Sequence, residues 1–228
     1  MGTEITGVVG FPETWRQRPR KTTSLRPKIV CKPFNNEWMS VLQEQARPYL
    51  ARLFRGDEAH LDGAAQDAMA AWLAMTAMTG SWANSDYGGW GIPRTLRRQL
   101  QSTGQVPQGM QIWIAPCAHD DRPAGIAARA VRYRLIRLEH VPVVTPAGVK
   151  LPFRPAFAVA MSIGNMAALI FGHTHDPIWQ PGLSYDGRLG LALKRVFPAT
   201  QEVLDWPRYF ALNYVEFDTL INVLEPWQ

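Results

Sequence analysis

Three adjacent residues, His119-Asp120-Asp121, place one imidazole and two carboxylates together. Imidazole and carboxylate groups are the usual acids, bases and metal ligands of proteins, so the trio can serve an acid–base or a metal site. Arg122 and Pro123 follow directly, and this composition is typical of a solvated turn between two strands. Both interpretations stay open, and the turn is favoured.

A second candidate is the string Gly172-His173-Thr174-His175-Asp176-Pro177, which follows a predicted strand. It resembles the GHTHxP segment of calcineurin-like metallophosphoesterases, and the resemblance implies that His173 and His175 would hold a divalent metal of a two-metal centre. Such a centre needs further ligands from separate loops. The family's DxH, GDxxD and GNHD motifs do not occur in this chain. A polar loop is therefore the favoured interpretation, and a metal-dependent phosphoesterase or nuclease is the alternative.

No nucleophile motif accompanies these groups. GxSxG is missing, and the chain has two cysteines, Cys31 and Cys117, with no CxxC pair. This excludes a disulfide framework and a cysteine zinc site of the usual spacing. The first 30 residues lack the apolar segment of a signal peptide, so a reducing cytoplasm is the expected location.

Basic residues are concentrated at the N-terminus, although the whole chain has a net charge of only +5. Residues 1–32 contain seven basic and two acidic side chains, and the rest of the chain is neutral overall. This distribution favours local phosphate contacts over a uniformly cationic clamp. The alternative is that the arm aids solubility and that arginines elsewhere pair with carboxylates. The candidate nucleic-acid-binding residues are Arg16, Arg18, Arg20, Lys21, Arg26, Lys28, Arg94, Arg97, Arg98, Arg132 and Arg134.

Three of the nine tryptophans, Trp82, Trp90 and Trp179, fall in positions predicted to be loops. Tryptophan and arginine dominate the hot spots of protein interfaces, so these residues are candidates for binding a protein partner. The alternative is that their rings cover the edges of the core.

These residues are expected to be positioned by one globular α+β domain. A content of 46% apolar and 19% charged residues is typical of a folded soluble protein. We expect a basic, flexible arm over residues 1–28, extended or partly disordered, because it has few large apolar side chains to bury. The single domain then covers 29–228, with a helical part at 35–104, a sheet part at 110–172 and a C-terminal segment at 173–228.

Apolar residues at three- and four-residue spacing predict three helices in the helical part. The second is apolar around most of its circumference, which predicts a buried central helix. The predicted helices run from Asn35 or Asn36 to Gly56, over about Ala64–Thr79, and from Pro93 to about Ser102, before Gly104.

Strand patterns follow the helices, and Gly164-Asn165 is a two-residue hairpin signal. The uncharged run Pro155–Thr174 is interpreted as paired strands, because Gly164 and Asn165 interrupt it. The predicted order is helices first, then an antiparallel sheet, then a helical tail. This order is typical of an α+β fold. The predicted strands are Met110–Ala115, Ala127–Glu139 with a change of phase near Ile136, Ala156–Ile163 and Met166–Phe171, and the tail Ala199–Leu224 is predicted to hold one or two helices broken at Pro207.

The segment Ile29–Leu42 reads Ile-Val-Cys-Lys-Pro-Phe-Asn-Asn-Glu-Trp-Met-Ser-Val-Leu. It resembles the C-x-x-C-N-N-G-W-M-S-x-L segment of bacterial and phage HNH-endonuclease-like proteins, and the similarity covers residues 29–172. In those proteins a cysteine zinc knuckle and a catalytic histidine precede a helical and then β-rich region. The other similar segments are Trp72–Met78, Pro93-Arg94, Gly109–Ala115 and Met161–Phe171.

The departures from this pattern lie in the catalytic part. Phe34 occupies the position of the second cysteine of the zinc knuckle, and Glu37 occupies the position of the glycine in the C-x-x-C-N-N-G segment. Residues 1–30 contain no histidine. The single thiolate of Cys31 cannot build a four-ligand zinc site. The resemblance therefore implies a catalytically inactive relative, without a cofactor, that binds nucleic acid or a nucleoprotein complex. By analogy with small phage and mobile-element proteins, a role as inhibitor or adaptor is expected.

Overall fold

A computed structural model of the chain shows helices packed on an antiparallel sheet, which is the α+β fold predicted from the sequence. It describes residues 3–7, 37–83, 92–118, 132–138, 156–173, 187–199, 202–207, 210–213, 216–217 and 220. The helices are α2 (Trp38–Arg55), α3 (Gly63–Ala83), α4 (Arg94–Thr103) and α5 (Gly187–Ala192). The strands are β1 (Thr3–Gly7), β2 (Ala59–Leu61), β3 (Met110–Pro116), β4 (Arg132–Leu138), β5 (Ala156–Ile163), β6 (Met166–His173), β7 (Lys194–Phe197) and β8 (Leu204–Trp206).

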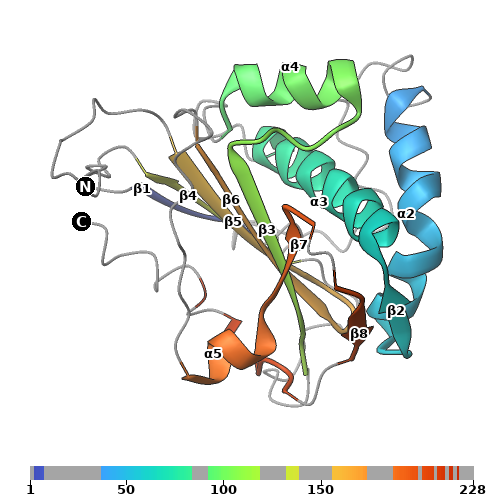
Figure 1. Cartoon of the computed structure of the whole chain (residues 1–228). Coiled ribbons are helices and arrows are strands. Elements are labelled where there is room, and N and C mark those ends of the chain that lie inside the picture. The colour runs from blue at the N-terminus through green and yellow to red at the C-terminus, as the bar shows by residue number, and fades with distance from the viewer. Residues whose placement is uncertain are drawn as a thin grey trace, which may run out of the picture.

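The six-stranded sheet has the order β1-β4-β5-β6-β3-β7, and every neighbouring pair is antiparallel. Figure 1 shows α3 lying along this sheet, with α2 beside it and α4 across its upper end. A separate two-stranded ribbon, β2 with β8, lies at the lower end of α2. The helical layer and the sheet therefore form the two main layers of the fold.

The hairpin predicted at Gly164-Asn165 joins β5 to β6, with Ile163 paired to Met166. Its turn packs on the end of α2, where the Asn165 N–H donates a 3.0 Å hydrogen bond to the Phe54 carbonyl. Gly164 has a φ of 56°, and a Cβ there would lie 2.4 Å from the same carbonyl oxygen. Glycine is required at this turn for both reasons.

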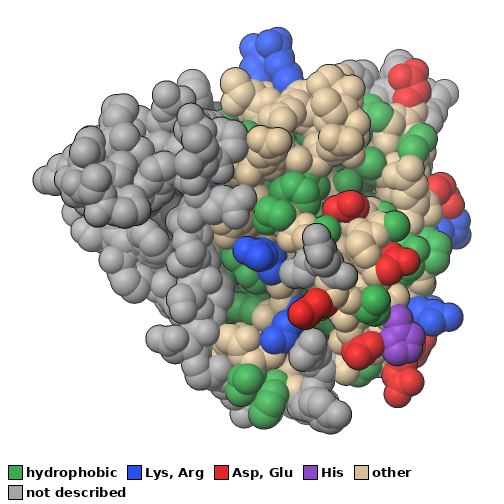
Figure 2. Space-filling view, viewed as in Figure 1, with side chains coloured by type: hydrophobic (Ala, Val, Ile, Leu, Met, Phe, Trp, Pro, Cys, Tyr) green, Lys and Arg blue, Asp and Glu red, His purple; other side chains and the backbone are tan. Residues whose placement is uncertain are grey.

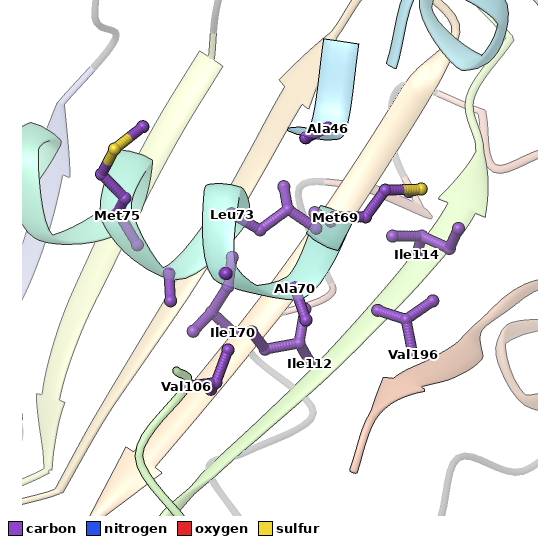
Figure 3. Close-up of a cluster of buried hydrophobic side chains, with 14 of the residues drawn as sticks. Ala46, Met69, Ala70, Leu73, Met75, Val106, Ile112, Ile114, Ile170 and Val196 are labelled. Carbon is purple, nitrogen blue, oxygen red and sulfur yellow. The ribbon is translucent and has the colours of Figure 1, made fainter. Parts of the chain in front are cut away.

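The side of the sheet that faces the helices is filled by one apolar core (Figure 3). Met69 and Leu73 of α3 are fully buried, as the prediction of a central helix required. Complete burial of one such side chain stabilises the fold by about 1.5–3 kcal/mol. The residues labelled in Figure 3 are Ala46, Met69, Ala70, Leu73, Met75, Val106, Ile112, Ile114, Ile170 and Val196.

The opposite side of the sheet is also covered. Trp113, Leu169 and Phe171 pack there in a second apolar cluster with Leu193 and Phe217 from the C-terminal segment. All eight residues of β6 are buried as a result. A strand covered on both sides carries a continuous apolar run and loses the alternation typical of a half-exposed strand.

The predicted helices are present with small shifts at their ends. α2 begins at Trp38, Glu37 is its N-cap residue without a capping side chain, and the expected caps Asn35 and Asn36 lie outside the described residues. Gly56 and Gly104 end α2 and α4 in the left-handed conformation, as predicted. α3 extends the predicted helix at both ends.

The change of phase expected near Ile136 does not interrupt the strand pairing. β4 pairs with β5 without interruption from Arg132 to Leu138. Leu135 is opposite Val159 and Ile136 is opposite Ala158, and these two partners belong to cores on different sides of the sheet. Adjacent apolar residues are compatible with a regular strand when its partner strand is buried on both sides, as β5 is.

The predicted tail helix is wrong at residues 204–206, which form β8. β8 pairs with β2, and each strand has one exposed residue between two buried ones. Three residues are too few for a strand period to show in the sequence. α5 and β7, which precede this tail, were not predicted either.

A further difference is β1, because the sequence predicted an arm without regular structure there. Thr3–Gly7 pairs with β4 at the edge of the sheet, and residues 8–36 lie outside the described part. The pairing partner is about 130 residues away, so only the folded sheet offers it. Among the described residues, no helix is long and apolar enough to cross a membrane.

Candidate functional site

Helix α4 presents two exposed arginines, Arg94 and Arg98. The helix is oriented by Leu96 and Leu100, which are four residues apart and buried in the core. Gly104 ends the helix, and its N–H donates a 2.8 Å hydrogen bond to the Leu100 carbonyl. Because the leucines fix the inner side, the arginine positions are fixed on the outer side.

The charge of α4 is not balanced within the helix. It contains Arg94, Arg97 and Arg98 and no acidic residue. Like charges three or four residues apart destabilise a helix by about 0.2–0.5 kcal/mol per pair. The three arginines also lie in the N-terminal half, where the positive end of the helix dipole disfavours cations. Within the helix, their charges therefore repel one another.

Arg97 is partly buried. Desolvation by burial, and then the nearby charge of Arg94, lower the pKa of Arg97 below the usual value for arginine. A guanidinium still stays charged at neutral pH, so the surface holds a partly desolvated cation beside another cation. A bound anion would offset the repulsion between the two cations.

Two of the three arginines of α2 form ion pairs. Arg47 lies 3.2 Å from Glu44, and Arg55 lies 2.7 Å from Asp57. Within the part of the chain that the structure describes, Arg94 and Arg98 form no ion pair.

The same contrast is visible on the surface. Figure 2 shows basic side chains standing above α4, at the top of the view, with no acidic side chain next to them. Acidic side chains gather on the right and lower right, over α2 and the β2–β8 ribbon. The exposed acidic residues of the ribbon and its flanks are Asp57, Glu58, Asp62, Glu202 and Asp205.

Two further predicted basic positions, 132 and 134, have a described backbone and belong to strand β4. Positions 132 and 134 of β4 pair with Ser162 and Ala160, and Ala160 belongs to the core on the side of the sheet away from the helices. Directly opposite residues of an antiparallel pair share a side of the sheet. The register therefore places Arg132 and Arg134 on the side opposite α4.

Most remaining candidates lie outside the described residues, or have only their backbone described. Trp82 is in the last turn of α3, with its backbone described. The candidates outside the described residues are Arg16, Arg18, Arg20, Lys21, Arg26, Lys28, Trp90, Trp179, His119, Asp120, Asp121, His175 and Cys31.

His173, the first histidine of the candidate metal motif, is the last residue of β6 and is 4% exposed. Its N–H donates a 2.9 Å hydrogen bond to the Gly109 carbonyl, and its ring centroid lies 5.9 Å from that of Phe171. No group of three potential metal ligands occurs among the described residues. The geometry around His173, within that part, is that of a residue packed at the end of a buried strand.

Sequence reasoning missed one pair of titratable residues. His60 of β2 and Asp205 of β8 are directly opposite, with 2.6 Å between Nδ1 and Oδ1. Both side chains are largely exposed, at 80% and 73%. The two residues are 145 positions apart and belong to three-residue strands, so no sequence pattern connects them.

Comparisons of the chain with protein-family models, with curated proteins and with solved structures find no match in any of the three.

Proposed function

We propose that this protein binds nucleic acid, alone or within a nucleoprotein complex, as a catalytically inactive binding protein related to the HNH-like group. The observation that carries the proposal is the cluster of Arg94, Arg97 and Arg98 on α4, which has no acidic residue in its helix. These charges destabilise α4 slightly, so their value is expected to lie in a ligand.

The ligand chemistry that suits this cluster is the phosphate backbone. Arginine forms forked, charge-assisted hydrogen bonds with phosphate oxygens, and such contacts do not depend on base sequence. Exposed Arg94 and Arg98 can move to meet a phosphate, while partly buried Arg97 supports the same patch of positive potential. The patch is small, so α4 alone supports weak binding.

The N-terminal segment supplies more charge of the same sign. It contains seven basic and two acidic residues in positions 1–32. Its charges and those of α4 belong to one chain, so binding to both would be cooperative through effective concentration. We expect the protein to act as an inhibitor or adaptor by binding DNA or RNA without cutting it.

The test measures binding of a 20-base-pair DNA duplex and a 20-nucleotide single-stranded RNA by fluorescence anisotropy between 50 and 300 mM salt. The variant Arg94→Gln/Arg98→Gln should bind about 3–10-fold more weakly at the lowest salt concentration, with a flatter salt dependence. Binding should fall steeply with salt for the unmodified chain.

The matched control is Arg47→Gln/Arg52→Gln on α2, which removes the same charge from exposed positions of another helix. It should bind like the unmodified chain. If both variants weaken nucleic-acid binding equally, the loss of affinity is due to net charge alone. That result would contradict a binding site on α4. Undetectable or salt-insensitive binding of the unmodified chain would reject the nucleic-acid proposal and favour a protein partner.

A further inference from the structure

The outer side of α4 carries a row of three long polar side chains. With about 3.6 residues per turn, Arg98 lies opposite the buried Leu96 and Leu100, and so at the centre of the outer side. Arg94 lies one turn before Arg98, and Gln101 lies one turn after it. All three side chains are exposed. We call these three residues the α4 stripe.

The side chains of the α4 stripe are free to bind a ligand. In the part of the chain that the structure describes, no hydrogen bond or ion pair involves any of the three side chains. Gln66, by contrast, is fully buried, and its amide donates hydrogen bonds of 3.0 and 2.8 Å to the Leu61 and Glu202 carbonyls. Gln101 therefore differs from a glutamine that supports the fold.

The surroundings of the α4 stripe suit a polyanion. The sequence contains no acidic residue from Ile92 to Ala118, a segment that includes all of α4. Figure 1 shows α4 at the upper end of the fold, outside α3. The acidic side chains seen in Figure 2 lie mainly over α2 and the β2–β8 ribbon. The α4 stripe thus offers a positive and uncharged polar surface without acidic neighbours in its own segment.

We propose that α4 enters the major groove of duplex DNA and that the α4 stripe distinguishes base pairs there. This inference rests on the nucleic-acid binding proposed above and adds sequence preference to it. The major groove of B-DNA is about 12 Å wide and about 8.5 Å deep, so it admits an α-helix. The seven-residue step from Arg94 to Gln101 rises about 10 Å, which is the length of about three base pairs.

The side chains of the α4 stripe match the hydrogen-bonding groups of particular bases. The forked guanidinium of Arg98 can donate to guanine O6 and N7, and the amide of Gln101 can both accept from N6 and donate to N7 of adenine. Arg94, near the start of the helix, can hold a phosphate. The major groove of A-form RNA is too deep and narrow for such contacts. Duplex DNA is therefore the form of nucleic acid that the α4 stripe fits.

The test begins with selection of tight binders from a library of 20-base-pair DNA duplexes with a random central sequence. We expect a short enriched sequence that contains neighbouring guanine and adenine. Fluorescence anisotropy then compares the enriched duplex with a shuffled duplex of the same composition. The unmodified chain should prefer the enriched duplex by about 5–30-fold.

Two variants on α4 remove base contacts without changing net charge. Gln101→Ala removes the amide, and Arg98→Lys removes the forked donor but keeps the positive charge. Each should lower the preference for the enriched duplex by about 5-fold or more. The matched controls are Gln45→Ala and Arg52→Lys at exposed positions of α2, which should keep the preference of the unmodified chain.

The outcomes distinguish this inference from the function on which it rests. If the unmodified chain binds duplexes in a salt-dependent way but selection enriches no sequence, base recognition is rejected and the proposed function stands. A preference that survives both α4 variants, or equally tight binding of an RNA duplex of the enriched sequence, also rejects α4 in the major groove. If the unmodified chain binds no nucleic acid, both proposals fail.

Discussion

The β5–β6 turn and the outer side of α4 differ in how tightly the surrounding protein constrains them. At the turn, the Asn165 N–H bonds to the end of α2, and the Asn165 carbonyl accepts a 2.9 Å hydrogen bond from the Cys117 N–H. On α4, Arg94 and Arg98 are exposed and form no ion pair with a described residue. Substitutions at the turn should therefore report on folding, and substitutions on α4 should report on a ligand.

The largest expected effect is on folding, for Gly164→Ala at the turn. The new Cβ would lie 2.4 Å from the Phe54 carbonyl oxygen, at a φ of 56° that side chains disfavour. We expect a loss of about 2–4 kcal/mol in the free energy of unfolding, measured by urea denaturation. Gly104→Ala is the control, because its φ is 69° but nothing lies within 4 Å; it should lose only about 1 kcal/mol. Equal losses would mean that contact with α2 does not constrain the turn.

Gly172→Ala tests the same kind of constraint inside the sheet. A Cβ at Gly172 would lie 2.4 Å from ring carbons of Phe157, which is fully buried. Overpacking of this kind costs about 1–3 kcal/mol. Phe157→Leu should partly relieve the clash, so the double variant should lose less stability than the two single losses combined. Additive losses in urea denaturation would argue against this contact.

On α4 the expected effects are smaller and divided between two measurements. Arg94→Gln/Arg98→Gln should weaken nucleic-acid binding while leaving folding intact. Removal of the like-charge pair should keep the free energy of unfolding unchanged or raise it by about 0.2–0.5 kcal/mol. A typical destabilising substitution costs about 1 kcal/mol. A larger loss would show that these arginines support the fold, and α4 would then not differ from the turn in reporting on a ligand.

The smallest effect is expected for the His60–Asp205 pair on the β2–β8 ribbon. It joins distant parts of the chain, but both side chains are mostly in solvent. We expect a coupling below about 0.5 kcal/mol in a double-mutant cycle of His60→Ala and Asp205→Ala, and less at high salt. A larger coupling that resists salt would mean that an exposed contact can constrain the fold as strongly as the buried turn.

Much of the architecture follows from local patterns. Gly56 and Gly104 end helices, Gly164-Asn165 forms a hairpin, and Ala64–Thr79 is the body of the buried helix α3. These predictions are confirmed because each depends on the conformational freedom of glycine or on the period of apolar residues. The orientation of α4 has the same origin, because Leu96 and Leu100 are four residues apart and buried.

The elements that were missed depend on distant partners. β1, β2 and β8 are short, and their pairing partners are far away in the sequence. The sequence predicted a change of phase near Ile136 because it does not show that the partner strand β5 is buried on both sides. The location of Arg132 and Arg134 on the side opposite α4 likewise follows only from the register with β5.

The sequence by itself determined the α+β composition, the main helices, the β5–β6 hairpin and the position of the charge excess near the N-terminus. Those properties arise from residues close together in the chain, where backbone preference and apolar period act directly. Tertiary structure alone decided that Arg94 and Arg98 form no ion pair with a described residue, that the register assigns positions 132 and 134 to the side of the sheet away from α4, and that β1 joins the sheet edge. These depend on strand register and on layers formed between distant segments, which have no local signal because the partner residues are specified elsewhere in the chain.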